Sequence, residues 1–83
     1  MQSERNLKMR REKFTMERNI LEVGDVVDLT EGRLPRAWYY TAEPAAAMSV
    51  NIDLNKRIKS SKGTVVSKVH EGASYTIEIE VEE

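Results

Sequence analysis

The last third of the chain has the clearest pattern of apolar and polar positions. From Tyr75 the residues alternate strictly, with Tyr75 and three aliphatic residues at odd positions and polar residues at even positions. This period of two predicts a strand with one buried and one solvated face. A β-branched run over residues 63–69 precedes it, and Gly72 lies between the two runs. The pattern predicts a C-terminal antiparallel β-hairpin.

The alternation leaves the register of this hairpin open. A two-residue turn would set Val66 opposite Ile77, whereas a five-residue loop would set Val65 opposite Ile79. Either register places the same aliphatic face of the last strand toward the core.

An earlier apolar pattern predicts another strand. Leu21, Val23, Val27 and Leu29 share one parity, and Gly24 indicates a bend or bulge as the strand begins. Because an isolated hairpin is only marginally stable, we expect this strand to pack on the two C-terminal ones.

Residues 30–62 have no clear period. A turn is expected over residues 30–35, a loop or one helical turn after Pro44, and an Asn- and Lys-rich excursion ending in a turn over residues 51–63. The region is too long for plain loop in so small a domain, so we expect it to contribute to the core.

The first residues are predicted to lie outside the core. On a helical wheel their apolar residues split between nearly opposite sides, with Leu7, Phe14 and Leu21 on one and Met9, Met16 and Ile20 on the other. We therefore predict a helical or disordered N-terminal extension over residues 1–19 and a small β-barrel domain over residues 20–83. One hypothesis makes Met16 the true start, since RREK upstream back-translates into purine-rich codons like a bacterial ribosome-binding site.

Composition narrows the class of protein. The chain has 83 residues and no Cys, which excludes disulfides and thiolate metal sites and is typical of a reducing cytoplasm. No apolar run approaches the length of a membrane span, and charges occupy the place of a signal peptide's apolar core. We expect a cytoplasmic protein that does not insert in a membrane.

Charge is distributed in bands. Residues 56–68 hold five basic and no acidic side chains, and residues 69–83 hold five acidic and no basic ones. If the two segments are neighbouring strands, their charges neutralise each other. The alternative is a basic binding patch.

The order of these elements resembles a known fold. VGDVVDL, a long excursion, and KGTVVSKVHEGASYTIEIEVEE are similar to small SH3-like barrels of the KOW and translation-protein type. The resemblance covers roughly residues 21–82 and implies a mainly β, SH3-like barrel that acts by binding. The passage RIKSSKGTVV is also similar to small bacterial proteins of unknown function.

The aromatic run Trp38-Tyr39-Tyr40 raises the question of what its rings contact. Pro35 and Pro44 favour an extended backbone, because each biases the residue before it away from helix. In an extended chain Trp38 and Tyr40 share a face, and Tyr39 takes the other. We predict Trp38 and Tyr40 inward and Tyr39 outward.

The aromatic run and the arginines beside it favour a protein-interaction or self-association module, since Trp, Tyr and Arg dominate interface hot spots. The candidate binding residues are Arg33, Arg36, Trp38, Tyr39 and Tyr40, with Leu34 as a further apolar anchor. A purely structural interpretation has Trp38 capping the barrel and Tyr40 filling its core.

The alternative is a module for RNA or single-stranded nucleic acid in which one of these rings stacks on bases. Its phosphate-binding residues would be Lys56, Arg57, Lys59, Lys62 and Lys68. A sequence pI near 5.9 weighs against it.

Catalytic chemistry has little support. His70 is the single histidine and is expected to be exposed in a turn, and Glu78, Glu80 and Glu82 line a solvated strand face. No nucleotide motif or catalytic triad is present. We expect no enzyme activity, cofactor, metal or small-molecule substrate.

Overall fold

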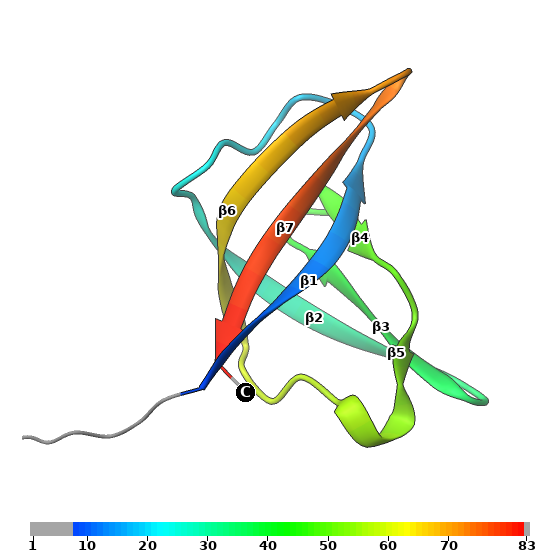
Figure 1. The fold of residues 1–83 in the computed structure, drawn as a ribbon. Helices are drawn as coiled ribbons and strands as arrows, with labels where there is room; N and C mark the ends of the chain where they lie inside the picture. The colour runs from blue at the N-terminus through cyan, green and yellow to red at the C-terminus, as the bar shows by residue number, and fades with distance from the viewer. Residues whose placement is uncertain (1–7, 83) are drawn as a thin grey trace, which may run out of the picture.

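A computed structural model describes residues 8–82 of the chain. Seven strands and one 3-10 turn cover most of this range (Figure 1). They are β1 (Met9–Met16), β2 (Val26–Leu34), β3 (Ala37–Ala42), β4 (Ala47–Ser49), β5 (Ile52–Asp53), η1 (Leu54–Lys56), β6 (Lys62–Glu71) and β7 (Ser74–Glu82). The described residues contain no α-helix.

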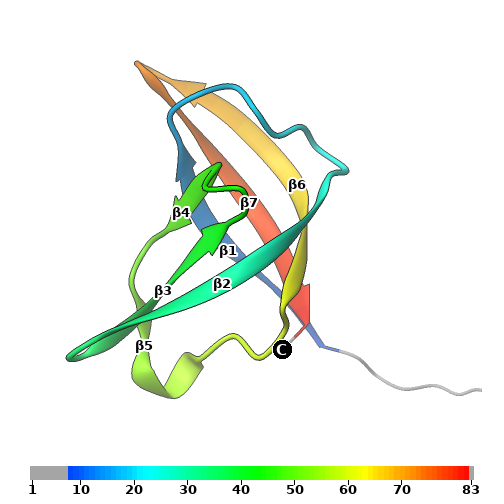
Figure 2. The same cartoon turned by 180° about the vertical axis from the view of Figure 1, so that it is seen from behind.

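Six of the strands close into an antiparallel barrel. Their order is β2-β6-β7-β1-β4-β3, and β3 pairs back with β2. The short strand β5 pairs with Ala37 and Trp38 of β3, along the same edge of β3 as β4. The long β6–β7 hairpin and β1 form one side of the barrel, and the β2–β3 hairpin crosses behind them (Figures 1 and 2). The predicted mainly β class is confirmed, and the closed barrel is compatible with an SH3-like barrel.

The C-terminal hairpin is confirmed. The pairing of Val66 with Ile77 is wrong, because Lys68 lies opposite Ile77, whereas the pairing of Val65 with Ile79 is confirmed. Gly72, with a φ of 62°, and Ala73 form a two-residue turn. A bulge between Val65 and Ser67 then shifts the pairing so that Val65 lies opposite Ile79. The bulge thus produces the pairing that we expected from a longer loop.

The core is made almost wholly of apolar side chains. The residues with at most 2% of their surface exposed are Phe14, Met16, Tyr40, Ala42, Val65, Ile77, Ile79 and Val81. The odd positions of β7 from Ile77 onward point inward, as the alternation predicts. No buried polar or charged residue occurs among the described ones.

The predicted N-terminal extension is wrong for Met9–Met16, which is β1. This strand pairs with β7 along its whole length, from Met9 opposite Glu82 to Met16 opposite Tyr75. The predicted domain boundary at residue 20 is therefore also wrong. A helical wheel was the wrong template, because Phe14 and Met16 are inward at a period of two. Residues 1–7 of the predicted extension lie outside the described residues.

The strand predicted from Leu21 onward begins later, at Val26. Leu21, Val27 and Leu29 are buried as expected, but Val23 is 59% exposed. Gly24 has a φ of 101° and donates its N–H to the Val65 carbonyl oxygen at 2.8 Å. The predicted bend at Gly24 therefore exists, and Val23 is exposed because it lies in the turn before β2.

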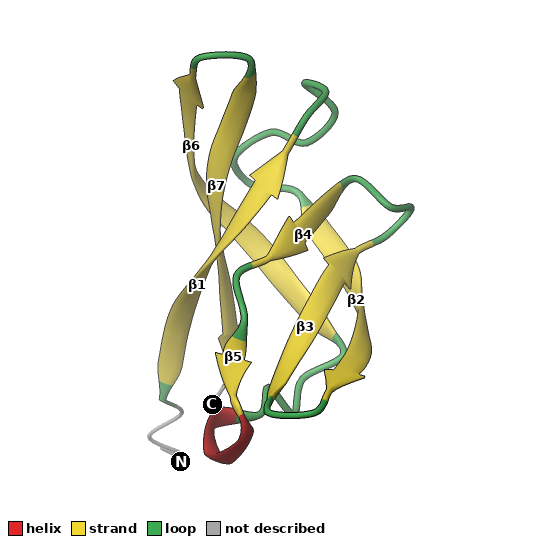
Figure 3. Ribbon diagram, turned by 90° about the vertical axis from the view of Figure 1, so that its right-hand side faces the viewer, coloured by secondary structure: helices red, strands yellow, loops and turns green. Residues whose placement is uncertain are grey.

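Residues 30–62 contribute to the core, as expected, but as strands rather than loops. The turn expected over residues 30–35 lies at Pro35 and Arg36, because β2 continues to Leu34. The expected loop after Pro44 is a turn over residues 43–46, and β4 follows it directly. The later excursion contains β5 and η1 (Figure 3).

Candidate binding site

The aromatic run lies on β3, and its extended backbone confirms the expected alternation. Tyr40 is 2% exposed and points into the core, as predicted. Trp38 shares its parity but is only half-buried, packed against the edge of the core. Tyr39 is also half-buried. Trp38 therefore lies on the inward face, as predicted, but it is only partly buried.

The hydroxyl of Tyr40 anchors a polar network at the barrel wall. It donates to a Glu31 carboxylate oxygen at 2.7 Å and accepts from the Ile58 N–H at 2.8 Å. Arg57 binds both oxygens of the same carboxylate, at 2.8 and 3.0 Å. The hydrogen bond from Arg57 lowers the pKa of Glu31. Burial and the bond to Glu31 raise the pKa of Tyr40 to about 12.

Trp38 lies beside this network and is surrounded by cations. The guanidinium carbons of Arg33 and Arg57 each lie 4.9 Å from its ring centroid, a cation–π distance. Its indole N–H donates to the Leu54 carbonyl oxygen at 3.1 Å. Arg33 is its cross-strand partner on β2, so pairing and the 3-10 turn together fix the ring.

Tyr39 lies across Gly32 of the neighbouring strand. The two residues are cross-strand partners, and a Cβ added at Gly32 would lie 2.1 Å from the Tyr39 Cζ. The ring thus occupies the space that a side chain at Gly32 would fill. Tyr39 shields the backbone there, although we predicted it to be a free outward contact.

Two exposed apolar residues lie near the tip of the β2–β3 hairpin, Leu34 at the end of β2 and Leu54, whose carbonyl oxygen accepts the Trp38 indole bond. Leu34 is 37% exposed and Leu54 is 40% exposed. We call this region the tip surface, which comprises Arg33, Leu34, Arg36, Trp38, Leu54 and Arg57. It brings Arg33, Arg36 and Trp38 of the predicted protein-binding set together with Arg57 of the predicted basic patch.

The basic patch does not form one continuous set of free cations. Lys62 pairs with Asp28, Lys68 bonds to Glu22 at 2.7 Å, and Arg57 pairs with Glu31. Lys56 and Lys59 have no ion pair within residues 8–82.

Among the described residues, the basic side chains of β6 and the acidic side chains of β7 do not form the ion pairs with each other that we had expected, but pair with residues of other segments. Glu78 and Glu80 of β7 face Arg11 of β1, at 3.9 and 3.7 Å. The lysines of β6 are instead paired with acids of the β1–β2 connection and of β2. Three of the five cations in residues 56–68 are thus paired, and their partners lie far from them in the sequence.

A small hollow of about 270 Å³ opens beside the Tyr40 network. Its lining includes Glu31, Arg57, Lys59, Ser60 and Ser61. Serine hydroxyls with two cations would suit an anion, but the Glu31 carboxylate occupies the same space and holds Arg57. The electrostatics therefore disfavour phosphate in this hollow.

The other chemical candidates lie apart from the tip surface. His70 is exposed, as expected, but it ends a strand and stacks on Tyr75 at a centroid distance of 4.5 Å. Within the described range, no three His, Cys, Asp or Glu residues are grouped to hold a metal ion. The same range contains no helix long and apolar enough to cross a bilayer.

Sequence reasoning did not identify Glu31 or Leu54 as neighbours of the aromatic run. Their contacts depend on the pairing of β2 with β3 and on the path of η1, which no periodic signal marks. Comparison of the chain with protein-family models, with curated proteins and with solved structures found no match.

Proposed function

We propose that the chain is a non-catalytic binding module that contacts a protein partner through the tip surface. The observation that carries this proposal is the partly buried indole of Trp38 with two guanidinium groups 4.9 Å from its centroid. Leu54, which is 40% exposed and accepts the indole N–H bond, adds apolar area beside it, and Leu34 adds a further exposed apolar residue at the end of β2. An aromatic anchor with arginines at its rim is the composition of interface hot spots.

The charges around the anchor indicate the kind of partner. Arg33, Arg36 and Arg57 belong to the tip surface, and Lys56 and Lys59 lie close to Arg57 along the chain. Two acids accompany these five cations, namely Glu31, which pairs with Arg57, and Asp53, which precedes Leu54. A partner segment with apolar and acidic side chains would complement this surface. The sequence resembles SH3-like modules of the KOW or translation-protein type, and that resemblance implies a binding role.

A nucleic-acid module remains the second candidate, because the same cluster of cations could contact phosphate. Three features favour the protein partner. Tyr40 is buried, Tyr39 lies across Gly32, and guanidinium groups occupy positions over the Trp38 ring that a stacked base would need.

Affinity capture with matched variants tests the proposal. Tagged wild-type protein, a Leu34→Ser/Leu54→Ser variant and a Val69→Ser control are exposed to lysate from cells that express the chain. Val69 is 51% exposed on the far part of β6, so its replacement matches the surface change away from the tip. We expect a protein that wild type and the control retain and the tip variant loses.

Two outcomes would contradict the protein proposal. Equal retention by the tip variant and the control would place the binding surface elsewhere. Capture that disappears after nuclease treatment, and that also requires Arg36 and Lys56, would favour the nucleic-acid module. Sedimentation equilibrium on the purified variants separates self-association through the tip surface from binding to a different chain.

A further inference from the structure

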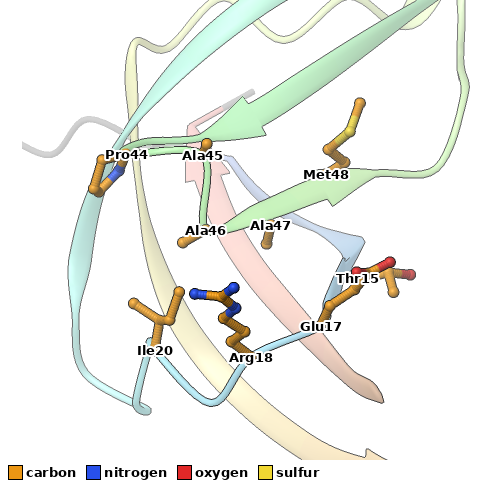
Figure 4. A pocket seen from close by; sticks show the side chains of 9 residues that line it. All are labelled: Thr15, Glu17, Arg18, Ile20, Pro44, Ala45, Ala46, Ala47 and Met48. Carbon is orange, nitrogen blue, oxygen red and sulfur yellow. The ribbon is translucent and has the colours of Figure 1, made fainter. Parts of the chain in front are cut away.

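A larger hollow lies at the opposite end of β3 from the tip surface. Its volume is about 540 Å³, within the range of ligand pockets. The end of β1, the β1–β2 connection, the β3–β4 turn and β4 enclose it (Figure 4). The lining residues are Thr15, Glu17, Arg18, Ile20, Pro44, Ala45, Ala46, Ala47 and Met48. We call it the Arg18 hollow.

Small and apolar side chains form most of the wall of the Arg18 hollow. Ala46 and Ala47 are 5% and 4% exposed, so their methyl groups close it on the side of the core. Ile20 and Met48 are each 51% exposed at its rim. An aliphatic group placed over the alanines would remove these exposed surfaces from water.

Arg18 adds one charge to this apolar space. Figure 4 shows its guanidinium group extending toward Ala46, with Ile20 beside it. Across residues 8–82, the Arg18 side chain has neither an ion pair nor a hydrogen bond. The nearby Glu43 carboxylate is already occupied, since it accepts bonds from the Thr30 hydroxyl and the Ala45 N–H.

We infer that the Arg18 hollow binds the carboxyl end of a peptide whose last residue is aliphatic. Guanidinium groups bind carboxylates through two parallel hydrogen bonds, and Arg18 has its donors free for this pairing. In a C-terminal residue the carboxylate and the side chain share one Cα. A single hollow with one cation and a floor of alanines therefore accommodates both.

The other charge at the hollow argues against a more highly charged anion. Glu17 also lines the space, and its carboxylate would repel a dianionic phosphate. A monoanionic carboxylate with an apolar body fits this balance best. The hollow and the tip surface lie at opposite ends of β3, which at six residues spans about 20 Å, so the two sites are separate.

NMR titration with small probes tests this inference. N-acetyl-leucine carries a free carboxylate and an isobutyl group, and N-acetyl-leucinamide differs from it only in lacking the charge. We expect N-acetyl-leucine to shift the amide signals of residues 17–20 and 45–48, with about fivefold weaker binding of the amide. N-acetyl-glutamyl-leucinamide, whose carboxylate is on a side chain, should bind no better than the leucinamide.

Matched arginine variants locate the charge that the carboxylate recognises. In Arg18→Gln the preference for N-acetyl-leucine over the amide should disappear. Arg11→Gln is the control, because Arg11 lies on β1 but faces Glu78 and Glu80, and it should keep the preference. The Trp38 indole signal should stay unmoved in every titration, so a failure here is distinct from a failure at the tip surface.

Several results would overturn the inference. They are the absence of localised shifts with N-acetyl-leucine, equal binding of the acid and the amide, and a preference that survives in Arg18→Gln. Equal binding of N-acetyl-glutamyl-leucinamide would also overturn it, because the hollow would then recognise an acidic side chain rather than a chain terminus.

Discussion

The two halves of the barrel fill the core by different means. Strands β6, β7 and β1 bury large side chains almost completely, namely Val65, Ile77, Ile79, Val81, Phe14 and Met16. Strands β2, β3 and β4 contribute Val27 and Leu29, the small Ala42 and Ala47, and Tyr40. In that half the largest buried side chain carries a hydroxyl that must be satisfied at the barrel wall.

This difference separates two sources of stability. The β6–β7–β1 half depends on the area of apolar surface removed from water, which is insensitive to pH. The β2–β3–β4 half depends in addition on the hydrogen bonds of Tyr40 with Glu31 and Ile58, whose strength varies with protonation. Substitutions in the first half should therefore cost more, and those in the second should change the response to pH.

The largest effect is expected when β1 is removed. A chain that begins at Met16 lacks the strand that pairs with β7 and loses Phe14 from the core. We expect no cooperative thermal transition by circular dichroism, because β7 would become an edge strand with its aliphatic face uncovered. A chain from Met16 that melts cooperatively near the wild-type temperature would show that β1 is dispensable. N-terminal sequencing of natively expressed protein tests the separate hypothesis that Met16 is the start.

Two cross-strand partners in the β6–β7–β1 half allow a buried aliphatic residue to be compared with a charged one. Ile79 and Glu12 are partners on β7 and β1. Ile79→Ala empties a fully buried aliphatic site and should lower the free energy of unfolding by about 2–5 kcal/mol. Glu12→Ala removes its ion pair with Arg10 and should cost at most about 1 kcal/mol. Urea denaturation of both variants measures the difference, and equal costs would mean that the Glu12 position is as important to the core as that of Ile79.

The same pair explains why β7 could be predicted from the sequence and β1 could not. The inward positions of β7 from residue 77 are all aliphatic, so the period of two is visible. The inward positions of β1 begin with Arg10 and Glu12, whose charges bond to each other at 2.8 Å, and only Phe14 and Met16 are apolar. A charged pair that faces inward near the strand's end hides the alternation from any hydropathy pattern.

Some residues of the candidate site could be predicted from the sequence, but their arrangement could not. The sequence indicated Trp38 and Arg33 as binding candidates because of their types, and the parity rule placed Tyr40 inward. The exposure of Trp38 depends on where η1 passes, and the pairing of Arg57 with Glu31 joins residues 26 positions apart. Such contacts are set by the closed barrel, which local patterns do not specify.

In the second half, Tyr40→Phe should lower the free energy of unfolding by about 1–3 kcal/mol at neutral pH, because the buried Ile58 N–H loses its acceptor. The pKa of Tyr40 is raised to about 12, so between pH 10 and 12 the folded state keeps a proton that the unfolded state has released. Wild-type stability therefore falls as pH rises through this window, and the difference from Tyr40→Phe should narrow. Urea denaturation across this range measures it.

Tyr75→Phe is the control for that experiment, since the half-buried Tyr75 has no hydrogen bond from its hydroxyl among the described residues. A difference between wild type and Tyr40→Phe that stays constant up to pH 12 would contradict the role of the Tyr40 proton. At acidic pH the lowered pKa of Glu31 predicts the opposite trend, with stability lost as pH falls below the usual carboxyl value of 4.5.

The smallest effect concerns the β2–β3 hairpin, where a ring covers backbone instead of filling the core. Tyr39→Ala should cost about 0.5–1 kcal/mol, because the half-buried ring shields Gly32 on the partner strand. Gly32→Ala should destabilise the wild type, since the added Cβ displaces that ring. In a Tyr39→Ala background the same change should stabilise by about 0.5–1 kcal/mol, because Gly is a poor strand residue. A double-mutant cycle in urea measures this reversal in the sign of the stability change caused by Gly32→Ala. If the change has the same sign in both backgrounds, the Tyr39 ring does not cover Gly32 in the folded protein.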